Sequence, residues 1–231
     1  MAEHTHLLAE IRENIARKDP IKARLVLAYL ENVERSLREQ VLGAFRTADP
    51  DFAVPMLARF MSEHRDMASG LSLVREILAM KILSQPELVA AAIRDPQTPF
   101  RKVYISMAAE LRLESVVGDL VDALLATSDV EEINQLIETL GEIGDPTAIN
   151  PLSDFLYSGN RTLIISATKA LGKLGTPTAM LRLSERMGTD NQLDLLILDI
   201  FAKVQDAISL DKLNEAMRSH YAHLRTYAKK T

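Results

Sequence analysis

The stretch that decides the fold is residues 138–156, ETLGEIGDPTAINPLSDFL, because the chain repeats it one unit later. Residues 169–187 read KALGKLGTPTAMLRLSERM, and eight positions of the first stretch recur there, always 31 residues on. The matching pairs are Leu140 and Leu171, Gly141 and Gly172, Gly144 and Gly175, Pro146 and Pro177, Thr147 and Thr178, Ala148 and Ala179, Leu152 and Leu183, and Ser153 and Ser184. A period of this length is typical of stacked helical repeats, in which each repeat packs on its neighbours.

The repeated motif contains the end of one helix and the start of the next. Apolar residues at helical spacing precede it and form one stripe: Ile133, Leu136, Ile137, Leu140 and Ile143. Gly144 suits the residue just past a helix end, where a left-handed backbone is accessible without a Cβ. Asp145 can accept hydrogen bonds from the first N–H groups of the following helix, and Pro146 suits its first turn.

Gly141 and Gly172 lie inside the expected helices, where glycine costs about 1 kcal/mol relative to alanine. We interpret both as points at which neighbouring helices approach closely. Two further motifs predict where helices begin or bend. Pro55 predicts either a kink or a helix start nearer Val54, and the sequence from Ser84 to Glu87 predicts a capping box.

The repeated pattern resembles the HEAT repeat, in particular the short bacterial variety also found in phycobilin lyases. The resemblance is good over residues 138–187 and weakens toward both ends. It implies an all-α fold, a right-handed superhelix of about six to seven antiparallel helix pairs. We expect one domain over residues 1–231, with its clearest repeats at 113–144, 145–175 and 176–205 and a capping repeat at 206–231. HEAT repeats share an architecture, so the resemblance implies little about activity.

Composition narrows the class of protein. The chain of 231 residues is 47% hydrophobic, which is ample for a continuous core, and has no cysteine, which excludes disulfides and thiolate metal sites. The N-terminus lacks the pattern of a secretory signal, and the apolar runs are too short to cross a bilayer. We therefore expect a cytoplasmic protein with no membrane partner.

Metal and cofactor chemistry finds little support in the sequence. Deoxyhypusine hydroxylase is a HEAT-repeat enzyme whose iron ligands come as His-Glu pairs, and no histidine here is followed by glutamate. His220 and His223 share a helix face but have no second cluster to complete a site. We interpret His220 and His223 as surface residues and His4 and His6 as part of a frayed terminus, and the fifth histidine is His64. We predict no metal and no cofactor.

Nucleic-acid and hydrolase motifs are also missing. Some alkylpurine DNA glycosylases are built from HEAT-like repeats and use a basic concave face with aromatic side chains, tryptophan among them. This chain has no tryptophan and a net charge of −5, which argues against a nucleic-acid partner. It contains no glycine-rich phosphate loop and no nucleophile elbow, so we predict no catalytic residue.

Charge is unevenly distributed along the chain. Residues 105–160 hold eleven acids and one base, Arg112, giving 1 − 11 = −10, so the rest of the chain carries −5 + 10 = +5. On the expected helix 130–143, four residues line the face opposite the apolar stripe: Glu131, Gln135, Glu138 and Glu142. One repeat later the equivalent positions include Ser166, Lys169 and Lys173, so the stripe passes from acidic to basic. This pattern has two interpretations. Any solvated helix needs polar residues opposite its apolar stripe. Alternatively, these charges line a polarised groove that binds a partner.

We predict a non-catalytic scaffold that binds a partner protein with a basic patch through a concave, partly acidic, helix-lined groove. The predicted partner-binding residues are Glu131, Gln135, Glu138, Glu142, Lys169 and Lys173. Two alternatives stay open: an accessory or catalytic subunit of a lyase-type enzyme of the phycobilin-lyase kind, and a structural or assembly subunit that works as a dimer. The sequence names neither the partner nor the oligomeric state.

Overall fold

The computed structural model describes residues 2–29, 34–64, 68–188, 190–218 and 225–226. Within these ranges the chain forms fourteen α-helices and three short 3-10 helices, and it has no strand. The predicted all-α, HEAT-like stack of helices is thereby confirmed. The packing divides the chain into two compact units, Met1–Met107 and Ala108–Thr231, each of which is described by itself below. The expectation of one domain over residues 1–231 stays a prediction.

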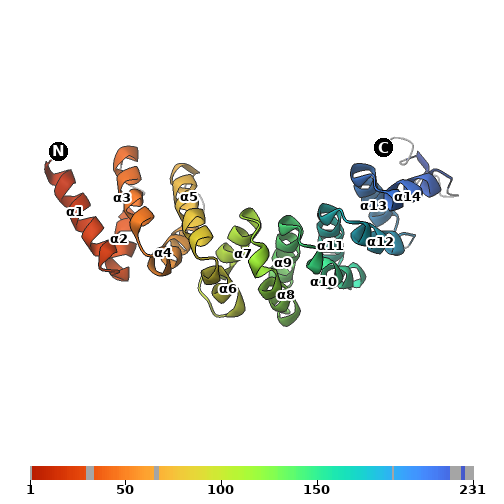
Figure 1. The fold of residues 1–231 in the computed structure, drawn as a ribbon, viewed down its shortest axis with the longest axis horizontal. Coiled ribbons are helices and arrows are strands. Elements are labelled where there is room, and N and C mark those ends of the chain that lie inside the picture. The colour runs from red at the N-terminus through yellow and green to blue at the C-terminus, as the bar shows by residue number, and fades with distance from the viewer. Residues whose placement is uncertain (1, 30–33, 65–67, 189, 219–224, 227–231) are drawn as a thin grey trace. The chain divides into compact units, whose positions relative to one another are not determined.

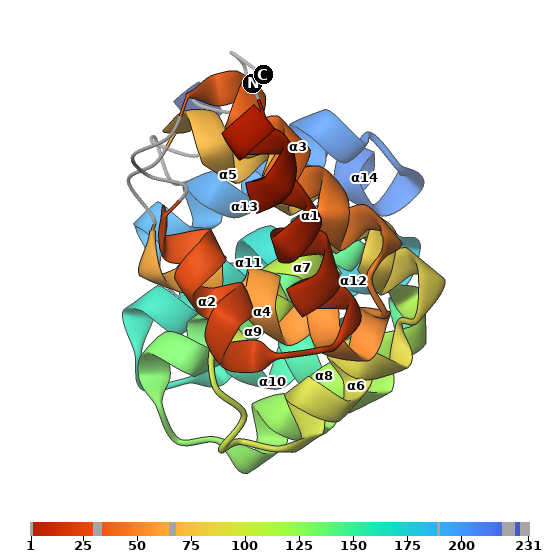
Figure 2. The same cartoon turned by 90° about the vertical axis from the view of Figure 1, so that its left-hand side faces the viewer.

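The first unit contains two layers of helices. Helices α1, α3 and α5 pack side by side in one layer, and α2 packs on α4 in the other (Figures 1 and 2). The bounds are α1 (Ala2–Ala16), α2 (Pro20–Tyr29), α3 (Arg35–Thr47), α4 (Pro50–Glu63), α5 (Ala68–Ser84) and α6 (Glu87–Arg94). The side chains that fill the core between them include Leu42, Phe45, Leu57, Ile77 and Leu78, all fully buried.

Two expectations for the first unit are corrected by its helix ends. Helix α4 begins at Pro50, where the Asp49 carboxylate accepts a hydrogen bond of 3.0 Å from the N–H of Asp51. The helix then continues through Pro55, so the alternative start near Val54 is wrong. The capping box at Ser84 is also wrong, because its hydroxyl donates to the carbonyl of Lys81 over 2.7 Å and so closes α5. No side chain caps α6.

The second unit also has two layers. Helices α9, α11 and α13 pack side by side, and α10, α12 and α14 follow one another in the second layer (Figure 1). The bounds are α8 (Val117–Ala126), α9 (Val130–Ile143), α10 (Ile149–Asp154), α11 (Arg161–Leu174), α12 (Pro177–Arg186), α13 (Asn191–Val204) and α14 (Ala207–Arg218), with 3-10 turns at Glu114–Val116, Pro146–Ala148 and Phe155–Tyr157. Helix α7 (Arg101–Glu110) runs across the boundary between the units.

The repeat motif produces the helix ends that its residues predict. Gly144 and Gly175 follow α9 and α11 with φ angles of 84° and 61°, in the left-handed region. Gln205 holds the same place after α13, with a φ of 56°, although it is not a glycine. Asp145 accepts a bond of 2.8 Å from the N–H of Thr147, which begins the next helix with a 3-10 turn.

The two internal glycines lie where neighbouring helices meet, as the sequence predicts. A Cβ added at Gly141 of α9 would lie 2.7 Å from both Cα and Cβ of Ala170 on α11. A Cβ added at Gly172 of α11 would lie 2.9 Å from Cδ1 of Ile200 on α13. Heavy atoms cannot approach so closely without displacement, so glycine is what lets these helices pack at their present spacing.

Polar contacts join residues that are one repeat apart in the sequence. In the first unit, Lys18 Nζ lies 2.9 Å from a carboxylate oxygen of Asp49, 31 residues on. Arg46 on α3 pairs with Glu76 on α5 over 2.7 Å, 30 residues on. Both pairs are exposed and contribute little individually. Both pairs link one repeat to the next along the chain.

Candidate partner-binding face

The structure brings the six predicted partner-binding residues onto two adjacent helices. Glu131, Gln135, Glu138 and Glu142 lie on α9, and Lys169 and Lys173 lie on α11, which packs directly beside it. Gln135 is half-buried and the other five are exposed. We call these six residues the α9/α11 face.

The amphipathic pattern of α9 explains why this set of side chains points outward. Its apolar stripe is buried in the unit: Ile133, Leu136, Ile137, Leu140 and Ile143. Asp129 caps the helix by accepting bonds of 2.9 and 3.0 Å from the N–H groups of Glu131 and Glu132. The acidic side chains of those two residues lie in the first turn, where the helix dipole favours negative charge. The acidic start of α9 is therefore locally stable.

A line of polar contacts crosses from α11 to the acidic stripe of α9. The buried hydroxyl of Ser166 donates to the side-chain oxygen of Asn134 over 2.6 Å. The amide of Asn134 in turn donates to a carboxylate oxygen of Glu138 over 3.1 Å. Asn134 was not among the predicted site residues, because its role depends on a serine 32 residues away. These bonds orient the Glu138 carboxylate relative to α11.

The charges on the face are partly compensated within it. Lys173 forms an ion pair with Glu142, and both side chains are about half exposed (47% and 49%). Lys169 makes no hydrogen bond or ion pair within the described part of the chain. Glu131 and Glu138 are exposed on α9, and Lys169 is exposed on α11, the helix packed against it. A partner would meet both signs of charge at fixed positions.

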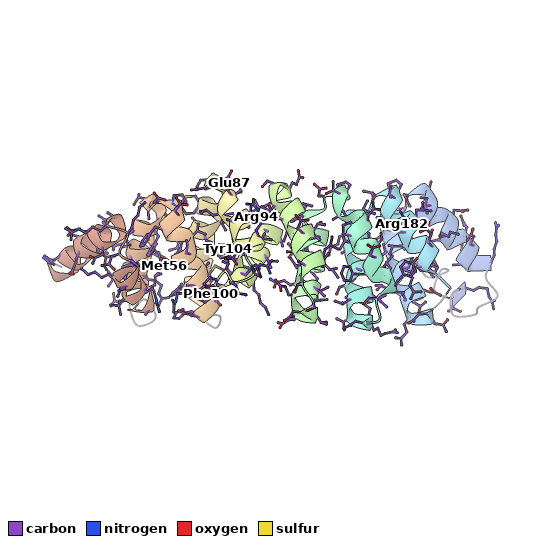
Figure 3. The ribbon with its side chains drawn as sticks, turned by 90° about the horizontal axis from the view of Figure 1, so that it is seen from below. Met56, Glu87, Arg94, Phe100, Tyr104 and Arg182 are labelled. Atoms are coloured by element: carbon purple, nitrogen blue, oxygen red, sulfur yellow. The ribbon has the colours of Figure 1, made fainter. Side chains whose placement is uncertain are left out.

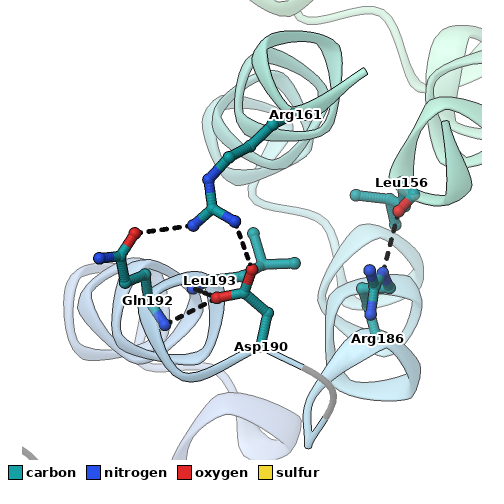
Figure 4. A network of polar contacts seen from close by, with 6 residues as sticks. All are labelled: Leu156, Arg161, Arg186, Asp190, Gln192 and Leu193. Carbon is teal, nitrogen blue, oxygen red and sulfur yellow. Dashed lines mark hydrogen bonds and ion pairs between the residues drawn. The ribbon is translucent and has the colours of Figure 1, made fainter. Parts of the chain in front are cut away.

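A second polar network holds α11 to α13 at the edge of the same layer (Figure 4). Arg161 donates to Asp190 over 2.6 Å and to Gln192 over 2.7 Å. Asp190 also caps α13 by accepting bonds from the N–H groups of Gln192 and Leu193. The hydrogen bond from Arg161, followed by these backbone bonds, lowers the pKa of Asp190 below its usual value of 3.8. This network positions the helices, and the sequence did not predict it.

The described residues show neither a histidine-based metal site nor a membrane-spanning helix. The His64 ring stacks on Phe60 at a centroid distance of 4.3 Å, and its Nδ1 lies 3.0 Å from the carbonyl of Phe60. His220 and His223 lie outside the described residues. In the ranges that the structure describes, no three His, Asp or Glu side chains gather as metal ligands would. Nor does any helix there combine the length and apolar content needed to span a bilayer.

Residues 119–197, which span α8 to the middle of α13, match the family model of HEAT repeats. The chain contains HEAT repeats. The α9/α11 face lies wholly inside the matched region, so the six residues belong to two successive HEAT repeats.

Among curated proteins, none matches the chain in sequence. Among solved structures, human deoxyhypusine hydroxylase in complex with glycerol is similar at 14% identity and a TM-score of 0.43, over 99% of this chain and 95% of that one. An engineered protein is similar at 13% identity and a TM-score of 0.44, over 90% of this chain and 66% of its own. A second engineered protein gives 15% identity and a TM-score of 0.33, over 90% of this chain and 95% of its own.

Proposed function

We propose that this HEAT-repeat chain is a non-catalytic scaffold that binds a partner protein through the α9/α11 face. The observation that supports the proposal is the arrangement of charge on two packed helices. Glu131 and Glu138 are exposed on α9, and Lys169 is exposed on α11, which packs directly on α9. A partner segment with two basic residues and one acidic residue would complement this face. The proposal needs no cofactor, and we place the scaffold in the cytoplasm.

Rigidity is the second argument for recognition by this face. The contact of Gly141 with Ala170 fixes the distance between α9 and α11, and Asn134 holds Glu138 from the same joint. Charges that are already positioned lose little conformational entropy when a partner binds. Complementary charges also speed association, an effect that weakens with salt. We therefore expect binding that depends on ionic strength.

Affinity capture with the full chain as bait tests the proposal. The test bait carries Glu131→Lys, Glu138→Lys and Glu142→Lys. We expect the parent chain to retain a partner at low salt, and the reversed bait to lose it, because three attractive charges become repulsive. Captured proteins are identified by mass spectrometry, and the affinity of the purified partner is measured for both baits.

A matched bait controls for net charge. It carries Glu114→Lys, Asp122→Lys and Asp154→Lys, three exposed acids outside the α9/α11 face in the same unit. This bait should bind as the parent does. If both variants lost the partner equally, the loss of binding would be explained by the change in net charge and not by the α9/α11 face. Equal retention by both would move the site away from α9 and α11, and turnover of a small-molecule substrate by the chain would contradict the non-catalytic part of the proposal.

A further inference from the structure

A pocket of about 330 Å³ lies in the first unit between α2 and α4. Helix α2 contributes Ile21, Arg24 and Leu25 to its lining, and α4 contributes Met56, Arg59 and Phe60. Figure 3 shows Met56 on α4 and, nearby along the first unit, Phe100. The pocket is in a different unit from the α9/α11 face and belongs to no site described so far.

The wall formed by α2 is apolar and uncovered. Ile21 and Leu25 are 71% and 66% exposed, which makes them among the most exposed large apolar side chains in the described residues. They lie four residues apart and so share one face of the helix. Met56 and Phe60 have the same spacing on α4, across the pocket. Phe60 is only 3% exposed, so α4 forms the apolar wall of the pocket and Ile21 and Leu25 form the ridge that projects beside it. A ridge beside an apolar wall is a surface on which a further helix can pack.

Two arginines and one carboxylate, that of Glu63, line the pocket, and the carboxylate pairs with one of the arginines. Arg24 is exposed and, among the described residues, forms no hydrogen bond or ion pair. Arg59 stands on the opposite side and is held in place, since it bonds to Glu63 over 2.7 Å and lies 5.6 Å from the centre of the Phe100 ring. Phe100 has a φ of 62°, an unfavourable backbone conformation for a bulky residue.

We propose that this pocket binds an amphipathic helix of another protein, with apolar anchors at positions i and i+4 and acidic residues beside them. The anchors would pack between Ile21 and Leu25 of α2 and the apolar wall of α4, and an acidic side chain would pair with Arg24. A small molecule fits the observations less well, because Ile21 and Leu25 extend out of a pocket already near the lower end of ligand-site volumes, about 300 Å³. The chain would then bind two partners of opposite charge, one on each unit.

Selection from a displayed library of 16-residue helical peptides tests the inference. The peptides vary at their apolar and charged positions, and the intact chain is the target. We expect the enriched peptides to carry apolar residues four positions apart flanked by Asp or Glu. Their dissociation constant should rise at least tenfold with Leu25→Ser, which removes an anchor contact, and with Arg24→Glu, which reverses the rim charge.

Two variants serve as controls. Leu125→Ser removes an apolar side chain of similar exposure (65%) on α8, and Lys169→Glu reverses a charge on the α9/α11 face. Both should leave peptide affinity unchanged, and thermal melting should show that all four variants are folded. Three results would overturn the inference: enrichment of no sequence, enrichment of basic peptides, or affinity that does not respond to Leu25→Ser. Loss of binding with Lys169→Glu alone would assign the peptides to the other face.

Discussion

Two neighbouring helix–helix contacts of the second unit, here called joints, have a glycine at the equivalent repeat position but differ in what that glycine meets. At the joint of α9 and α11, Gly141 faces the backbone of Ala170, whose Cα would lie 2.7 Å from an added Cβ. At the joint of α11 and α13, a Cβ added at Gly172 would meet three side-chain atoms of Ile200: Cδ1 at 2.9 Å, and Cγ1 and Cγ2 at 3.0 Å. A backbone atom cannot move without moving its helix, whereas an isoleucine can change rotamer. The distance between α9 and α11 is therefore tightly constrained by the glycine, and the distance between α11 and α13 is less so.

The largest effect is expected from Gly141→Ala. The new methyl group would force α9 away from α11, at a cost that exceeds the gain in helix propensity, and we expect the free energy of unfolding to fall by about 2 kcal/mol. Urea unfolding of the full chain measures it. Ala170→Gly should not rescue the variant, because the Cα of residue 170 stays in place. Full rescue would show that the contact is one of side chains.

Gly172→Ala should have a smaller effect. The Ile200 side chain can yield, and alanine gains about 1 kcal/mol of helix propensity, so we expect stability within about 1 kcal/mol of the parent. Combining it with Ile200→Ala removes all three atoms that crowd the added Cβ: Cδ1, Cγ1 and Cγ2. The double variant should then be more stable than the two single changes predict by about 0.5 kcal/mol. A loss as large as that of Gly141→Ala would abolish the contrast between the joints.

Gln205→Gly tests the end of α13, where the third repeat lacks the glycine of the first two. Since Gln205 has a φ of 56°, glycine there would relieve a left-handed conformation and should raise stability by about 0.5–1 kcal/mol. The reverse change, Gly175→Gln after α11, should lower it by a similar amount. Thermal melting of both variants measures the pair. Destabilisation by Gln205→Gly would mean that the glutamine side chain makes a compensating contact.

The smallest effect concerns pH and the charge at the α11/α13 joint. The pKa of Asp190 is lowered below 3.8 by the hydrogen bond from Arg161. A carboxylate with a lowered pKa stabilises the fold above its unfolded pKa, and this contribution is lost as pH falls through its folded pKa. Asp190→Asn can still cap the helix, as Asn160 does for α11. Its melting temperature should therefore be slightly lower at neutral pH and should fall less on acidification below pH 3.8.

Asp211→Asn is the control for that experiment. Asp211 is an exposed acid on α14 and makes no hydrogen bond or ion pair within the described residues. Its variant should follow the parent across the whole pH range. A curve for Asp190→Asn that coincides with the parent would show that the ion pair with Arg161 does not contribute to the stability of the joint.

The features predicted well from sequence are those decided by one residue's own backbone chemistry. Gly144 and Asp145 end one helix and begin the next because of the conformations and bonds that these residue types favour. Gly141 could be interpreted in the same way, since an internal glycine is costly and therefore needs a reason. The all-α fold follows from such signals repeated along the chain.

The features missed depend on what lies opposite a residue. Asn134 bridges two helices only because Ser166 lies against it in space. The Ser84 hydroxyl donates to a carbonyl at the end of α5 instead of capping α6. The local sequence does not show which of these two hydrogen bonds is the more stable. The exposure of Leu25 could not be predicted, because α2 carries apolar residues all around its circumference. Its sequence therefore does not indicate which face is turned to solvent.

The spacing of the polar contacts has a consequence for how the chain is made. Lys18 meets Asp49 and Arg161 meets Gln192 across 31 residues, so the partners of a helix are synthesised shortly after it. A repeat can therefore complete its bonds once about 30 further residues have left the ribosome, and low contact order favours fast folding. The first unit should resist protease while the second is still being translated. Stalled chains from which residues 1–107 have fully left the ribosome, if digested as readily as unfolded chains, would contradict this sequence of events.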